Sequence, residues 1–591
     1  SMTQSASAKI GRFEVQSRIG GGMQGQVYLG WDPDLERKVA LKVVNLNDSD
    51  DDSYANDFVR EARLAAQISH PNVVPIFEAN LLRNAPVLVF EYVPGSTLRQ
   101  YLKLNEVGSE QDAISLMMDI GAGMQCAHAQ GIAHLDLSPN NIMIDADHKP
   151  RIMDFGLARM VTHDYARDGG FVTGTPRYMS PEHFSSQNLS CATDVFALGL
   201  IFYELLTGEY AINAKDVNAM VGTVCKVEVD WSKLQNAGVS AELIAVLRDM
   251  LHPDPECRIQ DAGEFMLMME EVLEIKRAEE RGQLALDFLL RRLQRRPEFP
   301  AFSESIIEIN RLTSDDSTAD YDKVSAVILR DFSLTNRVMK IANSAAFGGS
   351  GDGVKTISQA IARLGLDLVR MISNGLMMFD QAEDSNPKLT DALVCSFVAG
   401  LITRHLVSQT SRRLAEEAFI CGLFHNLGCH LVMYYLEHEA DDVEALINKG
   451  VDVEDAEREI LSTTSAALGK AVATNWHFPD SIVRCMTRAP RGPIALVEDS
   501  GEIVYLNVNF SNEVCALVHK DLTGNRARDE LGKLIARYDE VFPGEVQDLT
   551  TLLAAALDKF SQIAPTLNVD VANSSFCKKM QQIIADARVE T

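Results

Sequence analysis

Residues 134–156 read HLDLSPNNIMIDADHKPRIMDFG, and this stretch decides the fold when it is taken with the segments around it. It lies in an irregular, loop-rich interval from residue 132 to residue 182. Before about residue 105 the chain has short β-rich runs such as KVALKVV and APVLVFEYV, separated by polar turns. From about residue 110 onward, nearly all of the chain outside this interval has helical periodicity. A β-rich start followed by a helical body predicts an α+β, two-lobed first domain.

A glycine motif precedes this stretch. Gly20-x-Gly22-x-x-Gly25-x-Val27 lies between two strand-like runs, RFEVQSRI and QVYLGWD. Glycines let the backbone approach a triphosphate closely, so that amide N–H groups can face the phosphates. Alone the motif is weak evidence, because glycine-rich hairpins are common. The alternative for such a motif, a dinucleotide fold, expects a strand followed by a helix, whereas here a strand follows a strand.

One lysine lies on an otherwise apolar strand, at the end of the run VALK (39–42). Burying a lysine in such a position costs free energy unless an anion and a carboxylate lie next to its ammonium group. Glu61, on the following amphipathic segment DFVREARLAAQI, can supply the carboxylate. The spacing therefore predicts an anion site beside Lys42.

Further motifs follow in a fixed order, namely HLDLSPNN (134–141), DFG (154–156) and GTPRYMSPE (174–182). Together with the glycine motif and Lys42, this ordered set resembles the eukaryotic-like protein kinase family over about 265 residues, here 12–275. The resemblance implies a serine/threonine protein kinase that uses ATP and Mg²⁺.

The resemblance also implies a role for each site residue. Lys42 would hold the α- and β-phosphates and pair with Glu61. Asp136 would accept or orient the proton of the substrate hydroxyl. Asn141 and Asp154 would coordinate Mg²⁺, since oxygen ligands suit a hard cation. The implied ATP-binding residues are Gly20, Gly22, Gly25, Val27, Ala40, Lys42, Glu61, Glu91 and Val93.

Five further residues match the family at other positions. Phe90 matches the gatekeeper before the adenine hinge, and Thr175 is the loop residue typical of serine/threonine kinases. Glu182 and Arg258 match an ion pair with a structural role. Asp194 matches the buried aspartate at the start of the central helix.

Two positions depart from the family pattern. The arginine of the usual His-Arg-Asp triplet is Leu135, so a phosphorylated activation loop loses its main receptor. The lysine two residues after the aspartate is Ser138, a loss that costs on the order of 10² to 10³ in rate by analogy with other transition-state donors. A weak or specialised kinase, which we favour, and an ATP-binding pseudokinase both stay open. Thr162 and Thr173 are equally well interpreted as autophosphorylation sites or as exposed loop residues.

Residues 300–591 have helical periodicity almost throughout. The amphipathic segments are DYDKVSAVILRDFSLTNRVMKIANSAAFG (320–348), TISQAIARLGLDLVRMISNGLMM (356–378), AEEAFICGLFHNLGCHLVMYY (415–435) and AALGKAVATNWHFPDSIVRCMTR (466–488). In this order they resemble the bacterial HDOD domain, a relative of HD metal phosphohydrolases, over about residues 285–490. The predicted organisation is a kinase domain (12–275), a charged helical linker (276–297), an all-α HDOD domain (298–490) and its helical C-terminal extension (491–591).

Active HD phosphohydrolases hold a metal with histidines and an adjacent His-Asp pair. Here His425 is followed by Asn426, and no histidine stands near Cys395-Ser396, where one would align. His430 and His477 are lone histidines on amphipathic helices, and such residues are more often packed or on the surface than metal ligands. The hydrolase alternative is therefore weak. A non-catalytic interaction or sensory module with an unknown protein partner is favoured.

The composition limits the partners and the location. The formal net charge of −28 argues against nucleic acid or anionic membrane as the main partner. No apolar run approaches the roughly 18–20 residues of a membrane helix, and the N-terminus has no apolar signal region. The ten cysteines include no CxxC pair, as is usual for thiols in a reducing compartment. We therefore expect a cytoplasmic protein.

The expected partners are protein substrates with Ser or Thr acceptors, the chain itself included. A basic cluster before Pro297 is a candidate site for an acidic partner. It is better interpreted as a solvated helix face or as a contact with an acidic neighbouring domain. Its members are Arg291, Arg292, Arg295 and Arg296.

Overall fold

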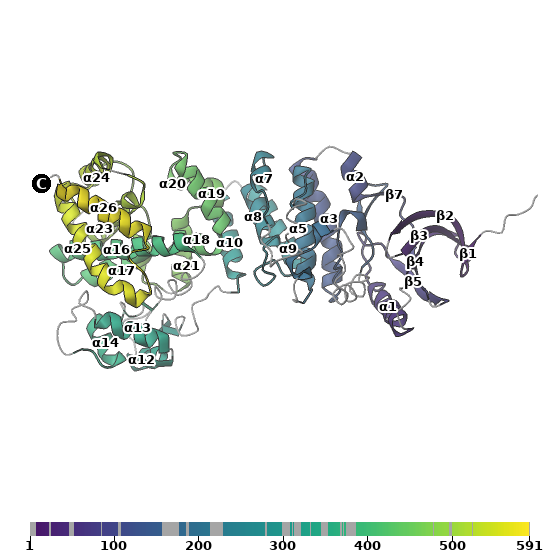
Figure 1. The fold of residues 1–591 in the computed structure, drawn as a ribbon, viewed down its shortest axis with the longest axis horizontal. Helices are drawn as coiled ribbons and strands as arrows, with labels where there is room; N and C mark the ends of the chain where they lie inside the picture. The colour runs from purple at the N-terminus through teal and green to yellow at the C-terminus, as the bar shows by residue number, and fades with distance from the viewer. Residues whose placement is uncertain are drawn as a thin grey trace, which may run out of the picture. The chain divides into compact units, whose positions relative to one another are not determined.

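The chain divides into two compact units, residues 1–284 and residues 285–591, in the computed structural model (Figure 1). The first unit contains all the strands of the described residues, and the second is helical. The structure describes residues 8–22, 25–45, 52–83, 85–104, 108–155, 176–184, 188–212, 228–277, 281–297, 308–309, 311–312, 321–330, 332–343, 353–366, 369, 372–373, 386–476, 478–495, 499–522 and 524–589.

The first unit begins with a six-stranded antiparallel sheet in the order β1-β2-β3-β4-β6-β5. Its strands are β1 (Lys9–Ile10), β2 (Phe13–Gly22), β3 (Gly25–Asp32), β4 (Arg37–Val44), β5 (Ile76–Leu82) and β6 (Ala85–Glu91). Helix α1 (Asp52–Ala65) packs against β5 and β6. Successive side chains on a strand point to opposite faces, so Val39 and Leu41 of β4 enter a core with Phe13 and Val89. The side chain of Lys42 lies on the opposite face of β4.

The helical body of the first unit follows the sheet, so the predicted β-rich start and helical body are confirmed. Its helices are α2 (Leu98–Leu104), α3 (Glu110–His128), α5 (Cys191–Thr207), α7 (Ser232–Asn236), α8 (Ala241–Met250) and α9 (Ala262–Arg277). A second sheet has the order β7 (Gly95–Thr97), β8 (Ile142–Asp145), β9 (Pro150–Ile152), and short turns occur at η1 (Pro139–Asn141), η2 (Pro176–Tyr178) and η3 (Pro181–His183). Helix α5 is buried along nearly its whole length, as its apolar sequence predicts.

From α10 onward the described residues contain helices and no strand. The helices are α10 (Arg281–Gln294), α12 (Tyr321–Arg330), α13 (Phe332–Ala342), α14 (Ile357–Leu364), α16 (Pro387–Thr410), α17 (Ala415–Phe424), α18 (Leu427–Tyr435), α19 (Glu437–Asn448), α20 (Val453–Leu461), α21 (Ser465–Asn475), α22 (Asp480–Cys485), α23 (Ser500–His519), α24 (Asn525–Arg537), α25 (Val546–Ile563), η5 (Ala564–Leu567) and α26 (Ser575–Val589). The predicted all-α second half is confirmed.

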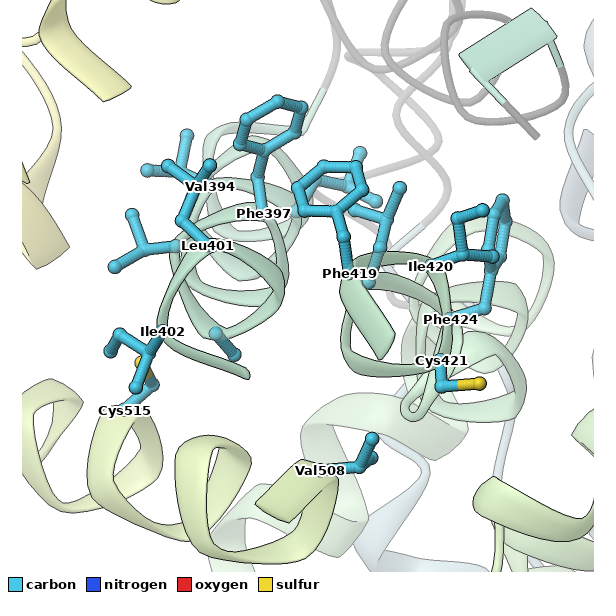
Figure 2. Close-up of a cluster of buried hydrophobic side chains, with 14 of the residues drawn as sticks. Val394, Phe397, Leu401, Ile402, Phe419, Ile420, Cys421, Phe424, Val508 and Cys515 are labelled. Carbon is cyan, nitrogen blue, oxygen red and sulfur yellow. The ribbon is translucent and has the colours of Figure 1, made fainter. Parts of the chain in front are cut away.

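Helix α16 is the centre of the second unit, where it packs against α17 and α23 (Figure 2). Two glycines let α16 and α17 approach closely. A Cβ at Gly400 would lie 2.7 Å from the carbonyl oxygen of Phe419, and one at Gly422 would lie 2.8 Å from Cα of Gly400. Around this crossing Phe397 and Phe419 meet edge to face with their ring centroids 5.3 Å apart.

The expectation that no segment is long and apolar enough to span a membrane is wrong for α16. Its 24 residues pass that test by length and composition, and 61% of the most apolar window is buried inside the protein. The segments Glu417–Tyr435 (α17 and α18) and Glu437–Asn448 (α19) also pass this test when they are taken together, but they are bent by 118° at the break between them. Since α16 carries the core of the second unit, we interpret it as a buried core helix.

The basic cluster of α10 makes a buried contact with an acidic residue. Arg292 is 2% exposed, and its Nη2 lies 2.8 Å from Oε1 of Glu439 on α19. Arg296 is buried as well, whereas Arg291 is exposed. Arg292 therefore contacts an acidic residue, as one of the two interpretations of the basic cluster expected. The other interpretation, a solvated helix face, is wrong for Arg292.

Candidate active site

Lys42 and Asp154 form the charged centre of the candidate site. Lys42 lies on the interior strand β4 and is 6% exposed, and its Nζ lies 3.0 Å from Oδ2 of Asp154. Val27 on β3 is directly opposite Lys42, and Ala40 precedes it by two residues, so these three share one face of the sheet. A buried ammonium group needs such a carboxylate, because its desolvation is costly. Three predicted ATP-binding residues and one predicted Mg²⁺ ligand are thus brought together.

Glu61, the predicted carboxylate partner of Lys42, lies half-buried on α1. The ion pair recorded for Lys42 is the one with Asp154, so its pairing with Glu61 stays a prediction. Helix α1 packs against β6, the strand next to β4, which keeps Glu61 on an element adjoining the site.

The glycine motif forms the paired ends of β2 and β3. Gly20 is opposite Val27, and Gly22 is opposite Gly25. A Cβ at Gly25 would lie 2.2 Å from the carbonyl oxygen of Val43, and its φ of +148° is one that other residues rarely adopt. The close packing of β3 against β4 therefore requires glycine at position 25.

Asp136 and Asn141 lie together in the segment before β8. Asn141 Nδ2 donates to the backbone oxygen of Asp136 at 2.6 Å and lies 3.5 Å from Asp136 Oδ2. The backbone oxygen of Asn141 accepts from the N–H of Met153, the residue before Asp154, at 2.9 Å. These contacts link the predicted base to both predicted Mg²⁺ ligands in one short network.

Asp194 holds the backbone of this segment from α5. Its Oδ2 accepts from the N–H of His134 and its Oδ1 from the N–H of Leu135, both at 2.7 Å. His128 Nε2 lies 2.9 Å from the same carboxylate. Leu135 is thereby held at a φ of +65°, a strained conformation for a branched side chain. The predicted burial of Asp194 is confirmed, and its contacts explain why the carboxylate is needed there.

The DFG segment packs against the same residues. The rings of His134 and Phe155 have centroids 4.9 Å apart, and His134 Nε2 lies 2.7 Å from the backbone oxygen of Met153. Both contacts flank Asp154, whose φ is +66°. Asp154 is therefore positioned from both sides, with its carboxylate toward Lys42.

The two positions that depart from the family pattern are both buried. The carbonyl oxygen of Leu135 lies 3.2 Å from Nε2 of His183, so a histidine supports this loop. Ser138 borders a cavity of about 10 Å³, enough for about one water molecule. The sequence interpretation missed His183, although it directly follows the GTPRYMSPE motif.

The predicted adenine hinge begins at the end of β6. Phe90 is opposite Ala40, and Val93 is buried. Arg151 of β9 lies with its Nη2 2.8 Å from Oε2 of Glu91, which ties the hinge to the strand that precedes DFG. Arg151 belongs to no motif, so this contact could not be predicted from the sequence.

Glu182 and Arg258 form a fully buried bidentate pair, as the resemblance implies. Arg258 Nη1 lies 2.6 Å from Glu182 Oε1 and Nη2 lies 3.1 Å from Oε2, with both side chains 0% exposed. Burial alone would raise the pKa of Glu182, but the hydrogen bonds from Arg258 hold that pKa below its usual range. Four predicted residues lie outside the described ones: Gly156, Thr162, Thr173 and Thr175.

Two histidines of the second unit, His425 and His430, are buried and form hydrogen bonds within the protein. His425 Nδ1 lies 2.6 Å from the backbone oxygen of Cys485, and His430 Nε2 lies 3.2 Å from Oγ of Ser396. Burial lowers the pKa of both histidines to about 4. Among the described residues no three His, Cys, Asp or Glu side chains gather as metal ligands would. His477 lies outside the described residues.

Comparison with known families matches two parts of the chain. Residues 13–274 match the protein kinase domain, and residues 299–490 match the HDOD domain. The serine/threonine-protein kinase PknB of Mycobacterium leprae (strain TN) is 34% identical over 260 residues, covering 43% of this chain and 42% of that protein. The serine/threonine-protein kinase PrkC of Bacillus subtilis (strain 168) is 29% identical over 255 residues, covering 43% of this chain and 39% of that protein. The chain thus spans about two fifths of these relatives.

Solved structures are also similar to the first unit. The crystal structure of the Mycobacterium tuberculosis PknI kinase domain is 20% identical and covers 46% of this chain and 99% of that chain, with a TM-score of 0.37. That score is too low to support a conclusion by itself. The family matches and the curated relatives support one: residues 13–274 belong to the protein kinase family, with bacterial serine/threonine kinases among their relatives, and residues 299–490 form an HDOD domain.

Proposed function

We propose that the first unit transfers the γ-phosphate of ATP to Ser or Thr hydroxyls. One observation supports this proposal: the contact of Lys42 with Asp154 and the contact of Asn141 with Asp136 belong to one network. Met153, the residue before Asp154, joins them because its N–H donates to the backbone oxygen of Asn141. A buried lysine paired with one carboxylate, and linked through the backbone to an amide and a second carboxylate, is the set of groups that phosphoryl transfer needs. The names of the bacterial relatives agree with it.

The residues at the site fit a magnesium ion. Because the amide nitrogen of Asn141 donates to Asp136, the amide oxygen is the atom that this side chain can offer a cation. The carboxylate of Asp154 supplies the second protein oxygen. Magnesium, when bound, neutralises charge on the β- and γ-phosphates.

Residues of the chain carry out the other steps, which are phosphate binding, proton transfer and positioning of the loop. Lys42 binds the α- and β-phosphates and is held for that task on a rigid interior strand. Asp136 accepts or orients the proton of the acceptor hydroxyl. Asp194 acts through the backbone, because its hydrogen bonds to His134 and Leu135 fix the loop that carries Asp136.

The acceptors are proteins, and the chain itself is one of them. Thr162 and Thr173 are the sites that we propose for autophosphorylation. The HDOD domain serves as a non-catalytic module that binds a regulatory protein partner. We place this activity in the cytoplasm, since the membrane-length helix α16 is a core helix.

A second candidate function is an ATP-binding scaffold in which nucleotide controls partner binding by the HDOD domain. Ser138 favours it, because an uncharged, buried residue stands where the family has a lysine that neutralises the γ-phosphate. The two candidates share ATP binding and differ in whether phosphate is transferred.

Mass spectrometry of phosphatase-treated protein, incubated with Mg-ATP, separates the two. We expect new phosphoserine or phosphothreonine in the wild-type chain and none in Asp136→Asn. If neither protein gains phosphate while both bind Mg-ATP, the scaffold function replaces the kinase function. The same experiment on residues 1–284 alone checks whether the helical half suppresses transfer.

A further inference from the structure

The second unit contains a cavity that the proposed kinase activity does not use. Its volume is about 610 Å³, whereas the cavity formed by α24, α25 and α26 measures about 80 Å³. Sites that bind small molecules have volumes of roughly 300–1,000 Å³. Most of the lining residues come from α16, α18, α19 and α20, and all of them belong to the second unit. The cavity is therefore independent of the candidate ATP site.

One wall of the cavity is apolar. The chain bends by 118° where α18 ends and α19 begins, and both helices contribute side chains to the lining. Val432 and Met433 come from α18, Ala440 and Ile447 from one face of α19, and Leu461 from α20. Met433, Ala440 and Ile447 are half-buried, so part of their surface is free to contact a ligand. A ligand can therefore bury an apolar chain against this wall.

The same cavity has more negative than positive charge. Lys388 lies in the lining, with its Nζ 3.0 Å from Oδ1 of Asp441 and 2.7 Å from Oε2 of Glu444. Arg488 lies behind the lining and pairs with Glu457, with its Nη2 2.8 Å from Oε1. The carboxylates of the lining belong to Asp391, Glu437, Asp441, Glu444 and Glu457. They exceed these cations by two even when His519 of the lining is counted as protonated, so the cavity attracts a cation.

Two carboxylates carry the charge that these pairs leave. Asp391 is 9% exposed, and its donors, Oγ of Ser574 at 2.6 Å and the N–H of Phe576 at 3.0 Å, are uncharged. Its ion pair is a long one, because His519 Nε2 lies 4.0 Å from Oδ2. Glu437 is exposed in the first turn of α19 and has no ion pair or hydrogen bond within the described part of the chain. A bound cation would offset the free energy that burying the Asp391 carboxylate costs.

We propose that this cavity binds a small organic cation in which a primary ammonium group is joined to an apolar chain. The ammonium group binds the carboxylates of Asp391 and Glu437, to which it offers three donors. The chain lies against Val432, Met433 and Ile447. The charge of the lining disfavours an anion. A metal ion is disfavoured because no three His, Cys, Asp or Glu side chains of the described residues gather as its ligands would.

Calorimetric titration of the full chain with three six-carbon probes tests this proposal. Hexylammonium, 1-hexanol and hexanoate share the chain and differ in the charge of the head group. We expect hexylammonium to bind at least about ten-fold more tightly than 1-hexanol, and hexanoate to bind least. Equal affinities for hexylammonium and 1-hexanol, tighter binding of hexanoate, or no binding of hexylammonium would overturn the proposal. So would tighter binding of a pentapeptide with a central lysine, because the cavity would then receive a protein side chain.

Two variants test the location. Glu437→Gln removes a carboxylate that makes no contact inside the described protein, so it should fold, weaken hexylammonium binding by about ten-fold and leave 1-hexanol binding unchanged. Asp529→Asn on α24 is the matched control, because that exposed carboxylate lies outside the lining, and it should change neither affinity. Ala440→Phe fills part of the cavity and should weaken the binding of both probes. An unchanged hexylammonium affinity in either Glu437→Gln or Ala440→Phe would contradict the proposed site.

Discussion

Lys42 and Gly25 show how strongly single positions of the site are constrained. Lys42 is buried on the face of β4 opposite the apolar core, and its charge is stable there because Asp154 lies 3.0 Å away. Gly25 faces the backbone of the neighbouring strand, where no side chain fits. Both constraints come from the sheet, so the elements predicted to bind phosphate are placed by the same packing that stabilises the fold.

At the residue scale we predict that Gly25→Ala destabilises the first unit by about 1–3 kcal/mol and weakens Mg-ATP binding, because of its φ and the clash with Val43. Gly20→Ala is the matched control for stability, since its Cβ would meet Val27 at an ordinary 3.7 Å. Thermal melting and calorimetric titration of both variants check this. Equal losses of stability in the two variants would show that the crowding at Gly25 has no effect.

Individual residue roles could be predicted where a motif carries them. Lys42, Asp136, Asn141 and Asp154 stand in motifs whose order alone identifies them, and the structure brings them into one network. The contact of Arg151 with Glu91 could not be predicted, because neither its residue type nor its spacing differs from those of surface arginines.

Elements of both units are fixed by buried polar contacts that span long stretches of sequence. The turn η3 is held by the Glu182–Arg258 pair, and α10 is held by the Arg292–Glu439 pair. The apolar runs allowed strands such as β4 and helices such as α5 to be predicted, because periodicity depends on local burial. Which charged residues meet across elements depends on the tertiary fold, so that part could not be predicted.

At the element scale we predict that Arg258→Ala destabilises the first unit by about 3–5 kcal/mol, since it leaves the Glu182 carboxylate buried without its cation. Lys149→Ala is the control, because its pair with Asp119 is exposed and its loss should leave stability almost unchanged. Chemical denaturation of the two variants measures the difference. Similar stabilities for both would mean that the buried pair contributes little.

The α17–α18 corner gives the second unit a dependence on pH. The pKa of His425 and of His430 is lowered by burial to about 4, below the ordinary value of 6.5. Between these values the unfolded chain binds protons that the folded chain does not, so stability falls as the pH drops from about 6.5 to 4. Each histidine contributes about 1.4 kcal/mol per pH unit in that window.

Unfolding of the second unit, followed from pH 7.5 to pH 4.5, measures this slope. The variants His425→Gln and His430→Gln should each reduce the slope of the free energy of unfolding against pH by the contribution of about one proton. A slope that survives both core substitutions would assign the effect to other groups.

On the scale of the whole molecule, the chain has two units with separate cores. The candidate ATP site lies entirely within the first unit. A ligand that binds only the folded form of one unit stabilises that unit. That the chain holds two domains could be predicted because its two halves carry motifs of two different families, whereas the contacts inside each unit could not, because they join residues far apart in sequence.

We therefore predict that Mg-ATP raises the melting temperature of the first unit alone. At about 100 times the dissociation constant the gain is about 2.7 kcal/mol. Differential scanning calorimetry of the full chain, with residues 1–284 as a reference for the assignment, measures it. Lys42→Met should abolish the shift, and a shift in the transition of the second unit would contradict the location of the site.

The most direct test of the central claim is the rate of phosphate transfer from Mg-ATP to a serine/threonine peptide at saturating nucleotide. We predict that Asp136→Asn lowers this rate by about 10²-fold to 10⁴-fold while its affinity for Mg-ATP stays that of the wild-type chain. Equal rates in the two proteins would contradict the role of Asp136. A wild-type chain that binds Mg-ATP and transfers no phosphate would contradict the kinase function itself.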